Sequence, residues 1–143
     1  MIGRIEEAKK VETKDLQGAQ NGFLIELFKD ATNTKTEVYL TSAAPGAFKG
    51  YHLHRVRAAR YICIKGKMKI TLWKPGTQEH EDYILDANTP QRLFIPKDTA
   101  TGLLNIGDEE GWLINYPDPA YDPGLKDEQV EYTLEDLQQG IVK

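Results

Sequence analysis

The chain has 143 residues, a formal net charge of -4 and a single cysteine. A chain of this length builds one sizeable core, so we expect a single domain over residues 1–143. The acidic balance argues against a nucleic-acid partner, and one cysteine excludes an internal disulfide and a cysteine-based metal site. The N-terminal segment has no apolar leader and no stretch approaches 18 apolar residues, so we expect a cytoplasmic protein without membrane contact.

Short strands separated by turns are predicted along most of the chain. Residues 60–73, "RYICIKGKMKITLW", predict two strands joined at 65–67, with Cys63 buried in the first and Met68 in the second. Because such segments recur about every 8–12 residues, an all-β sandwich or barrel is predicted. The other predicted strands are 22–28, 36–42, 81–85, 92–96, 101–106 and 111–116.

The C-terminal tail is the one segment with helical signals. Thr133, followed by Glu135 and Asp136, predicts a helix cap, and the helix is expected to run through Gln139 and to end at Gly140. Before it, the segment "YPDPAYDPGLKDE" is rich in proline and aspartate, which predicts a surface loop.

Two of the three histidines, His52 and His54, lie one residue apart in "KGYHLHR". Residues i and i+2 of a strand share a face, so both side chains could point into a barrel. Histidine is a common metal ligand and is also suited to moving a proton near neutral pH. Two imidazoles do not complete a zinc or iron site, which usually has at least three protein ligands. The third histidine, His80, lies in a charged turn and is expected to be solvated.

The spacing around the two histidines resembles the two motifs of the cupin superfamily. Every gap from Gly46 to Gly66 is kept, and so is every gap from Pro96 to Asn105. This resemblance implies a cupin jelly-roll barrel of two antiparallel sheets. Ala59 stands where cupins have a glutamate ligand, and Thr101 stands where they have a third histidine. Alanine cannot ligate and a neutral hydroxyl is a poor ligand, so no metal site is expected.

A narrower resemblance is carried by four segments that occur in order: "NGFLIELFK", "PGAFKGYHLHR…YICIKGKMKITLW", "RLFIPKDTATGLLNI" and "DEEGWLINYPDPAYDP". They are similar to the dTDP-4-dehydrorhamnose 3,5-epimerase family, and the related dTDP-sugar 3,4-ketoisomerases share the "GYH-x-H" and "ICIKG" patterns. The resemblance covers roughly residues 22–132. It implies an isomerase that removes a proton alpha to the ketone of a dTDP-4-keto-6-deoxyhexose, without metal or organic cofactor, and a homodimer.

The same resemblance implies roles for individual residues. His52 is expected to be the base, and Tyr116 the acid on the opposite face of the sugar, with Tyr121 as the second choice. Lys49 falls where the family has an arginine that contacts the diphosphate, and Lys29 falls near another such position. The full set expected to bind substrate is Lys49, His54, Arg60, Lys29, Glu26 and Tyr121.

The chain departs from the family at several positions. Ala59 replaces a lysine or glutamine that faces the pocket, and the family's histidine after the Ile-Pro turn is Thr101 here. The family also has an aspartate partner for the base in its C-terminal region, and residues 131–143 contain no evident replacement for it. The alternatives to the enzyme are therefore a cupin that binds a nucleotide sugar or other small ligand without turnover and, less favoured, a metal-dependent cupin.

Overall fold

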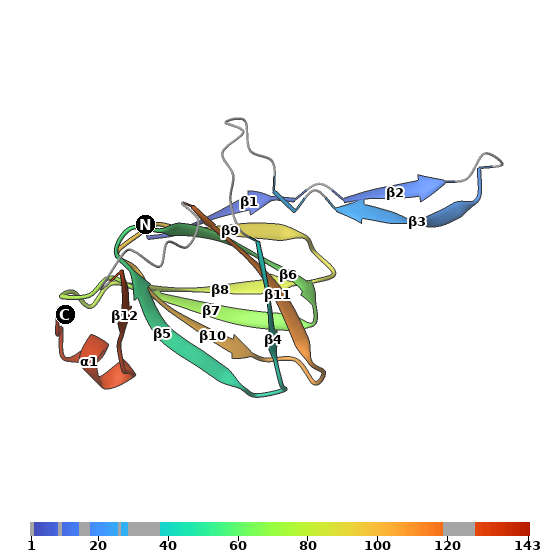
Figure 1. Cartoon of the computed structure of the whole chain (residues 1–143). Coiled ribbons are helices and arrows are strands. Elements are labelled where there is room, and N and C mark those ends of the chain that lie inside the picture. Colours follow the sequence, from blue (N-terminus) through green and yellow to red (C-terminus); the bar gives the residue numbers. More distant parts are fainter. Residues whose placement is uncertain (1, 9, 15–17, 26, 29–37, 119–127) are drawn as a thin grey trace.

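The computed structural model describes residues 2–8, 10–14, 18–25, 27–28, 38–118 and 128–143. Nearly all of its regular structure is β-strand (Figure 1). The elements in chain order are β1 (Arg4–Glu7), β2 (Lys10–Lys14), β3 (Gln20–Ile25), β4 (Tyr39–Ala43), β5 (Phe48–His54), β6 (Ala58–Lys65), β7 (Lys67–Trp73), β8 (His80–Asp86), β9 (Gln91–Ile95), β10 (Ala100–Asn105), β11 (Gly111–Asp118), β12 (Gln129–Glu131) and α1 (Leu134–Gln138).

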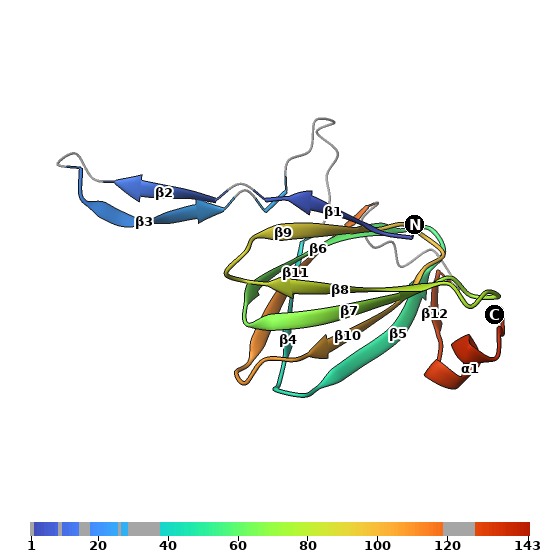
Figure 2. The same cartoon turned by 180° about the vertical axis from the view of Figure 1, so that it is seen from behind.

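Two antiparallel five-stranded sheets form the body of the molecule. Sheet I has the strand order β1-β9-β6-β11-β4, and sheet II has the order β12-β5-β10-β7-β8. The two views of Figures 1 and 2 show the sheets as opposed layers. This arrangement confirms the predicted all-β, cupin jelly-roll fold.

The main core lies between the two sheets and follows from the period-2 alternation of their strands. On β7, Met68, Ile70 and Leu72 are fully buried and alternate with more exposed residues. Sheet I contributes Leu93 and Leu113 to the same cluster. Removal of this apolar surface from water is the main stabilising term, at about 25 cal/mol per Å².

Cys63 lies in this core, as the sequence predicted, and is 3% exposed. Burial raises the pKa of its thiol to about 11, and thiols react as thiolates. We therefore expect an aromatic disulfide reagent to leave Cys63 unmodified in folded protein at pH 8 and to label it rapidly in denaturant. Absorbance of the released thiol measures this. Labelling of the native protein at the denatured rate would contradict the packing.

Most predicted elements are confirmed to within about two residues. The tail helix has Thr133 as its N-cap, with a reciprocal pair of bonds between Thr133 and Asp136. It ends before Gly140, whose φ of 72° continues no right-handed helix. Residues 36–37 of one predicted strand and 119–127 of the predicted loop lie outside the described residues. The sequence analysis missed three short strands, β1, β2 and β12.

The hairpin β2–β3 extends away from the two sheets (Figures 1 and 2). An isolated two-stranded hairpin is marginally stable in water.

Within the described part of the chain, no helix is long and apolar enough to cross a membrane.

Candidate functional site

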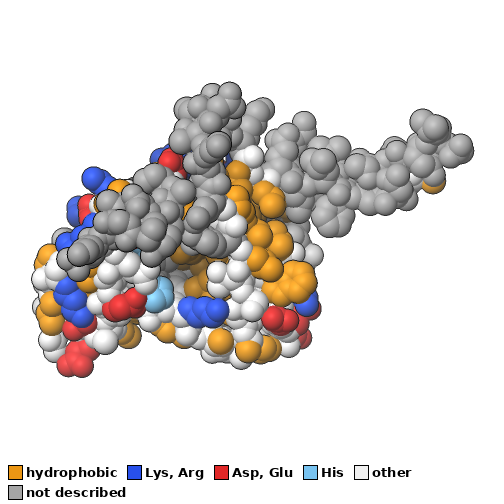
Figure 3. Space-filling model, in the orientation of Figure 1, with side chains coloured by type: hydrophobic (Ala, Val, Ile, Leu, Met, Phe, Trp, Pro, Cys, Tyr) orange, Lys and Arg blue, Asp and Glu red, His pale blue; other side chains and the backbone are white. Residues whose placement is uncertain are grey.

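A cavity of about 320 Å³ opens between the sheets and contains the two histidines. Sheet II supplies one wall from β5 and β10, and sheet I supplies the opposite wall from β4, β6 and β11. The cavity is lined by Thr41, Lys49, His52, His54, Tyr61, Thr101, Leu103, Leu113, Asn115 and Gln129. A histidine and a basic side chain reach the surface close together on the face shown in Figure 3.

The geometry of β5 directs Lys49 and both histidines into this cavity. The pairing of β5 with β10 shifts register between Thr101 and Leu103, opposite Gly50. A β-bulge of this kind redirects the side chains on either side of it. Gly50 has a φ of 122°, and a Cβ there would lie 2.5 Å from the Thr101 carbonyl oxygen. Only glycine therefore fits at the position where β5 changes register.

His52 faces a carboxylate that the sequence analysis did not identify. Strand β12 pairs with β5 so that Glu131 lies opposite His52, and Glu131 Oε2 is 2.6 Å from His52 Nδ1. The present orientation of the two groups lacks hydrogen-bond geometry. The Glu131 side chain is 63% exposed. The sequence analysis found no evident replacement for the family's aspartate in residues 131–143, and the structure places the Glu131 carboxylate there, beside His52.

His54 is held by a buried ion-pair network behind the cavity wall. Its Nδ1 lies 3.1 Å from Glu128 Oε2 and 2.8 Å from Arg57 Nη2. Glu128 Oε1 also accepts bonds from the backbone N–H and the Nε of Arg57. Glu128 is 7% exposed and the Arg57 side chain is 10% exposed. Nδ1 donates to Glu128 or accepts from Arg57 according to the tautomer of the ring, and neither contact involves Nε2.

This network shifts the pKa values of its members. Burial lowers the pKa of His54 and outweighs the Glu128 carboxylate, which raises it, while Arg57 lowers it further. Burial alone would raise the pKa of Glu128, but the hydrogen bonds from Arg57 and His54 hold it below its usual value. At neutral pH the network therefore consists of a neutral His54, an ionised Glu128 and a cationic Arg57.

These shifts predict that the free energy of unfolding falls on acidification. Unfolded His54 takes up a proton near pH 6.5, above the pKa of the folded group, so stability falls below that pH. Glu128 adds a further loss at lower pH, because its folded pKa is depressed and its contribution disappears as the carboxylate is protonated. Urea unfolding between pH 7 and pH 5 measures the slope, which His54→Asn should reduce. An unchanged slope in that variant would contradict the assignment.

The opposite wall of the cavity presents a phenol and a carboxamide. Tyr61 on β6 and Asn115 on β11 are register partners and both line the cavity. Burial raises the pKa of the Tyr61 hydroxyl to about 12, and the nearby Arg57 charge acts against that rise. The Oδ1 atom of Asn115 is buried and accepts no hydrogen bond from the described residues. Polar groups in this state are usually satisfied by water or a ligand.

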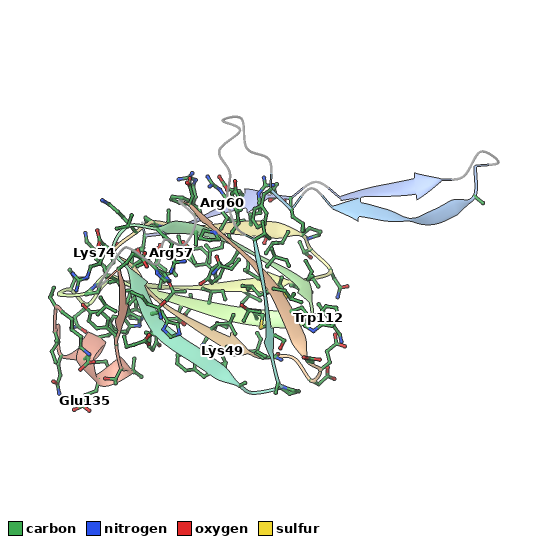
Figure 4. All side chains as sticks on the ribbon, in the orientation of Figure 1. Lys49, Arg57, Arg60, Lys74, Trp112 and Glu135 are labelled. Atoms are coloured by element: carbon green, nitrogen blue, oxygen red, sulfur yellow. The ribbon has the colours of Figure 1, made fainter. Side chains whose placement is uncertain are left out.

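Two residues of the predicted site lie outside the cavity. Tyr116 follows Asn115 on β11, so it points to the outer face of sheet I, where its ring stacks on Phe28 at 4.3 Å. Arg60 likewise alternates with Tyr61, and its Nε donates to Glu6 Oε1 at 2.8 Å. Figure 4 shows Arg60 beside β1, apart from Lys49 on β5. The structure therefore does not support Tyr116 as the acid or Arg60 as a substrate contact.

The remaining predicted residues divide into two groups. Lys49, His52 and His54 all line the cavity, and Lys49 Nζ donates to the Ser42 carbonyl oxygen at 2.6 Å. Glu26, Lys29 and Tyr121 lie outside the described residues.

A protein-family model described as the polysaccharide biosynthesis C-terminal domain matches residues 17–129. The probable low-salt glycan biosynthesis epimerase Agl13 of Haloferax volcanii is 30% identical over 131 residues, which cover 83% of this chain and 84% of that protein. This chain belongs to the polysaccharide biosynthesis C-terminal domain family. The predicted resemblance to sugar epimerases is confirmed by this relative.

Two solved structures share the fold of this chain, one of a protein of similar length and one of a much longer protein. A dTDP sugar isomerase from Desulfovibrio desulfuricans superposes with a TM-score of 0.77 at 15% identity, covering 94% of this chain and 87% of that chain. The capsular polysaccharide assembling protein CapF from Staphylococcus aureus superposes with a TM-score of 0.65 at 20% identity, covering 71% of this chain. The match spans only 27% of the CapF chain.

The side chains at the positions where cupins bind a metal do not suit a metal ion in this protein. Thr101 lies directly opposite His52 on β10 and offers only a neutral hydroxyl, and Ala59 has no donor atom. The Nδ1 atoms of both histidines face charged partners within the protein. Among the described residues, no three histidine, cysteine or acidic side chains gather in a way that could hold a metal.

Proposed function

We propose that this protein is an epimerase or isomerase of a nucleotide-linked sugar. The proposed substrate is a dTDP-4-keto-6-deoxyhexose, and the proposed step is metal-independent removal of a proton alpha to the ketone. The observation that carries this proposal is the position of His52, on the wall of a sugar-sized cavity with Glu131 at its Nδ1. The glycan biosynthesis epimerase and the dTDP sugar isomerase support the choice of chemistry.

The His52–Glu131 pair provides a base with a defined free nitrogen. With Nδ1–H directed at the carboxylate, the lone pair of His52 is on Nε2, and the carboxylate stabilises the imidazolium that forms when Nε2 takes the proton. The electrons of the broken C–H bond move into an enolate. Lys49 supplies positive charge in the same cavity, either for the enolate oxygen or for the diphosphate.

The size of the cavity sets how the substrate would fit. Small-molecule sites usually have volumes of about 300–1,000 Å³, so about 320 Å³ is at the lower end. It suits the hexose alone, and the nucleotide would extend from the opening, where the half-exposed His52 lies. His54 would contact the sugar through its Nε2 atom.

Removing the charge of Glu131 should make His52 a weaker base but leave some activity. We expect Glu131→Gln to lower kcat by about 10-fold or more, since an amide orients the ring but stabilises the imidazolium less. Steady-state kinetics measure this, and Glu110→Gln, which makes the same change at an exposed residue outside the cavity lining, provides a comparison. A kcat unchanged in Glu131→Gln would show that the carboxylate does not assist His52.

Turnover and binding alone can be separated with one substrate. The protein is incubated with dTDP-4-keto-6-deoxyglucose, and proton NMR is used to follow both product signals and saturation transfer to the ligand. New signals from an epimer or isomer support the enzyme. Saturation transfer without any product would favour a binding protein, and turnover that depends on added iron or zinc would favour a metal-dependent cupin.

We also propose that the protein is a cytoplasmic homodimer. The outer face of sheet I carries exposed apolar side chains, including Leu40 at 57% and Trp112 at 36% exposure. The hairpin β2–β3 projects from the body beside β1, a strand of the same sheet (Figure 1). A second copy would cover this face and give the hairpin a surface to pack on. Light scattering with size-exclusion chromatography tests the dimer, and a monomer at micromolar concentration would contradict it.

A further inference from the structure

The carboxylate that faces His52 belongs to β12, a short strand at the edge of sheet II. Pairing with β5 places the backbone of Glu131 opposite His52 but does not set the direction of its side chain, which is 63% exposed. We propose that Gln129 and Lys143 are positioning residues that hold the Glu131 carboxylate at His52 Nδ1. This inference rests on the proposed function and adds two residues that the sequence analysis did not identify.

Gln129 acts on the carboxylate directly. Residues i and i+2 of a strand share a face, so Gln129 and Glu131 project from the same side of β12. Gln129 Nε2 donates to Glu131 Oε1 at 2.9 Å, while Glu131 Oε2 lies 2.6 Å from His52 Nδ1. The two oxygens of one carboxylate therefore have different partners. If the Glu131 side chain turned away from His52, it would also lose the bond from Gln129.

Lys143 acts on the backbone of the same glutamate. Tyr132 and Tyr51 exchange both of their backbone hydrogen bonds, so the carbonyl of Glu131, one residue earlier, points away from β5. An edge strand leaves such groups unpaired within its sheet. Lys143 Nζ donates to this carbonyl oxygen at 3.0 Å and lies 2.8 Å from Asp136 Oδ2. The lysine therefore links the free edge of β12 to helix α1.

Further contacts hold Lys143 in place. Its backbone N–H donates to the Tyr132 hydroxyl at 2.8 Å, and its carbonyl oxygen accepts a bond from Arg55 Nη2 at 2.9 Å. Leu137 of α1 is fully buried in the cluster that contains Leu53 of β5. Residues 129–143 thus fold back beside the strand that carries both histidines (Figure 1).

The position of the carboxylate determines which nitrogen of the His52 ring carries the proton. A lone pair on Nδ1 would repel a carboxylate oxygen 2.6 Å away, so the neutral ring holds its proton on Nδ1. The lone pair is then on Nε2, the nitrogen that the proposed step uses. Gln129 and Lys143 would act by increasing the fraction of His52 rings in this tautomer.

The test measures the tautomer of His52 without any substrate. Proton–nitrogen NMR spectra of protein with isotope-labelled histidine distinguish protonated from unprotonated ring nitrogens, and His52→Gln identifies the His52 signals. We expect wild-type protein at pH 8 to hold the proton mainly on Nδ1. Gln129→Leu should lower the ratio of the Nδ1–H to the Nε2–H form by about 3- to 10-fold, the factor that one net hydrogen bond contributes. Lys143→Met should lower it in the same direction.

Gln139→Leu is the matched control. Gln139 Nε2 donates to Glu135 Oε1 at 3.0 Å on the exposed side of α1. The control therefore removes the same kind of bond from the same segment, at a residue that does not line the cavity. Its His52 tautomer ratio should equal that of the wild type.

Kinetics separate positioning from substrate contact, because Gln129 itself lines the cavity. A positioning residue should change kcat in proportion to the tautomer ratio and leave KM within about twofold. An unchanged tautomer ratio in folded Gln129→Leu, or a raised KM with unchanged kcat, would overturn the role of Gln129. An unchanged ratio in folded Lys143→Met would overturn the role of Lys143. If the ratios change as expected but wild-type protein converts no substrate, the positioning stands and the proposed function fails.

Discussion

Replacing His52 by glutamine is expected to lower kcat for the nucleotide sugar by about 100- to 10,000-fold, with little change in substrate affinity. This is the usual contribution of a positioned general base. Glutamine keeps a polar side chain of similar reach opposite Glu131 but cannot take a proton. Initial rates, together with a dissociation constant from calorimetry, measure the two parts separately.

His80→Gln is the matched control for this variant. His80 is exposed and stacks on the Trp73 ring at 4.3 Å, and it does not line the cavity. Its replacement should leave kcat within about twofold, since surface substitutions of this kind have small effects. Equal losses in the two variants, or none in His52→Gln, would contradict the role of His52.

Glu128→Ala is expected to destabilise the protein by about 3–5 kcal/mol, the usual effect of removing one partner from a buried ion pair. The loss leaves the Arg57 guanidinium buried beside His54, and it removes the acceptor of the Arg57 backbone N–H. Urea unfolding followed by far-ultraviolet circular dichroism measures the free energy of unfolding.

Glu110→Ala provides the comparison, because Glu110 is an exposed residue before β11. Its effect should stay within about 0.5 kcal/mol. In the double variant Glu128→Ala with Arg57→Ala, the loss should be smaller than the sum of the single losses, since the two residues share contacts. Additive losses would show that the pair does not interact as described.

Strand periodicity predicted much of the fold and part of the site. The alternation that put Cys63 in the core also puts Tyr61 on the inner face of β6. In the same way, Leu113 in the core puts Asn115 on the inner face of β11 and Tyr116 on the outer face. Applied to those two strands, the rule would have placed Tyr61, and not Tyr116, on the side of the cavity from the sequence alone.

Other parts of the site depend on pairing that a sequence does not reveal. Glu128 and Glu131 reach the histidines because β12 pairs with β5, more than 70 residues earlier in the chain. A three-residue strand has too few positions to give a periodic signal. The interaction of Arg60 with Glu6 arises in the same way, since β1 is a short strand at the edge of sheet I.

Sequence signals predicted correctly those features that depend on residues close together in the chain. Thr133 and Asp136 cap α1 through bonds that span only three residues, so their spacing was sufficient to locate the helix. The His-x-His spacing likewise predicted a shared face for His52 and His54. What each histidine contacts depends on residues 128 and 131, and the two rings therefore have different surroundings despite lying one residue apart.

The most direct test of the central claim is the deuterium content of the sugar after incubation of dTDP-4-keto-6-deoxyglucose with the protein in D2O, read by mass spectrometry. If His52 is the base, wild-type protein introduces deuterium at a carbon adjacent to the C4 ketone, and His52→Gln does so at least about 100-fold more slowly. Deuterium entry at the same rate in both proteins, after subtraction of the uncatalysed exchange, would contradict this role of His52.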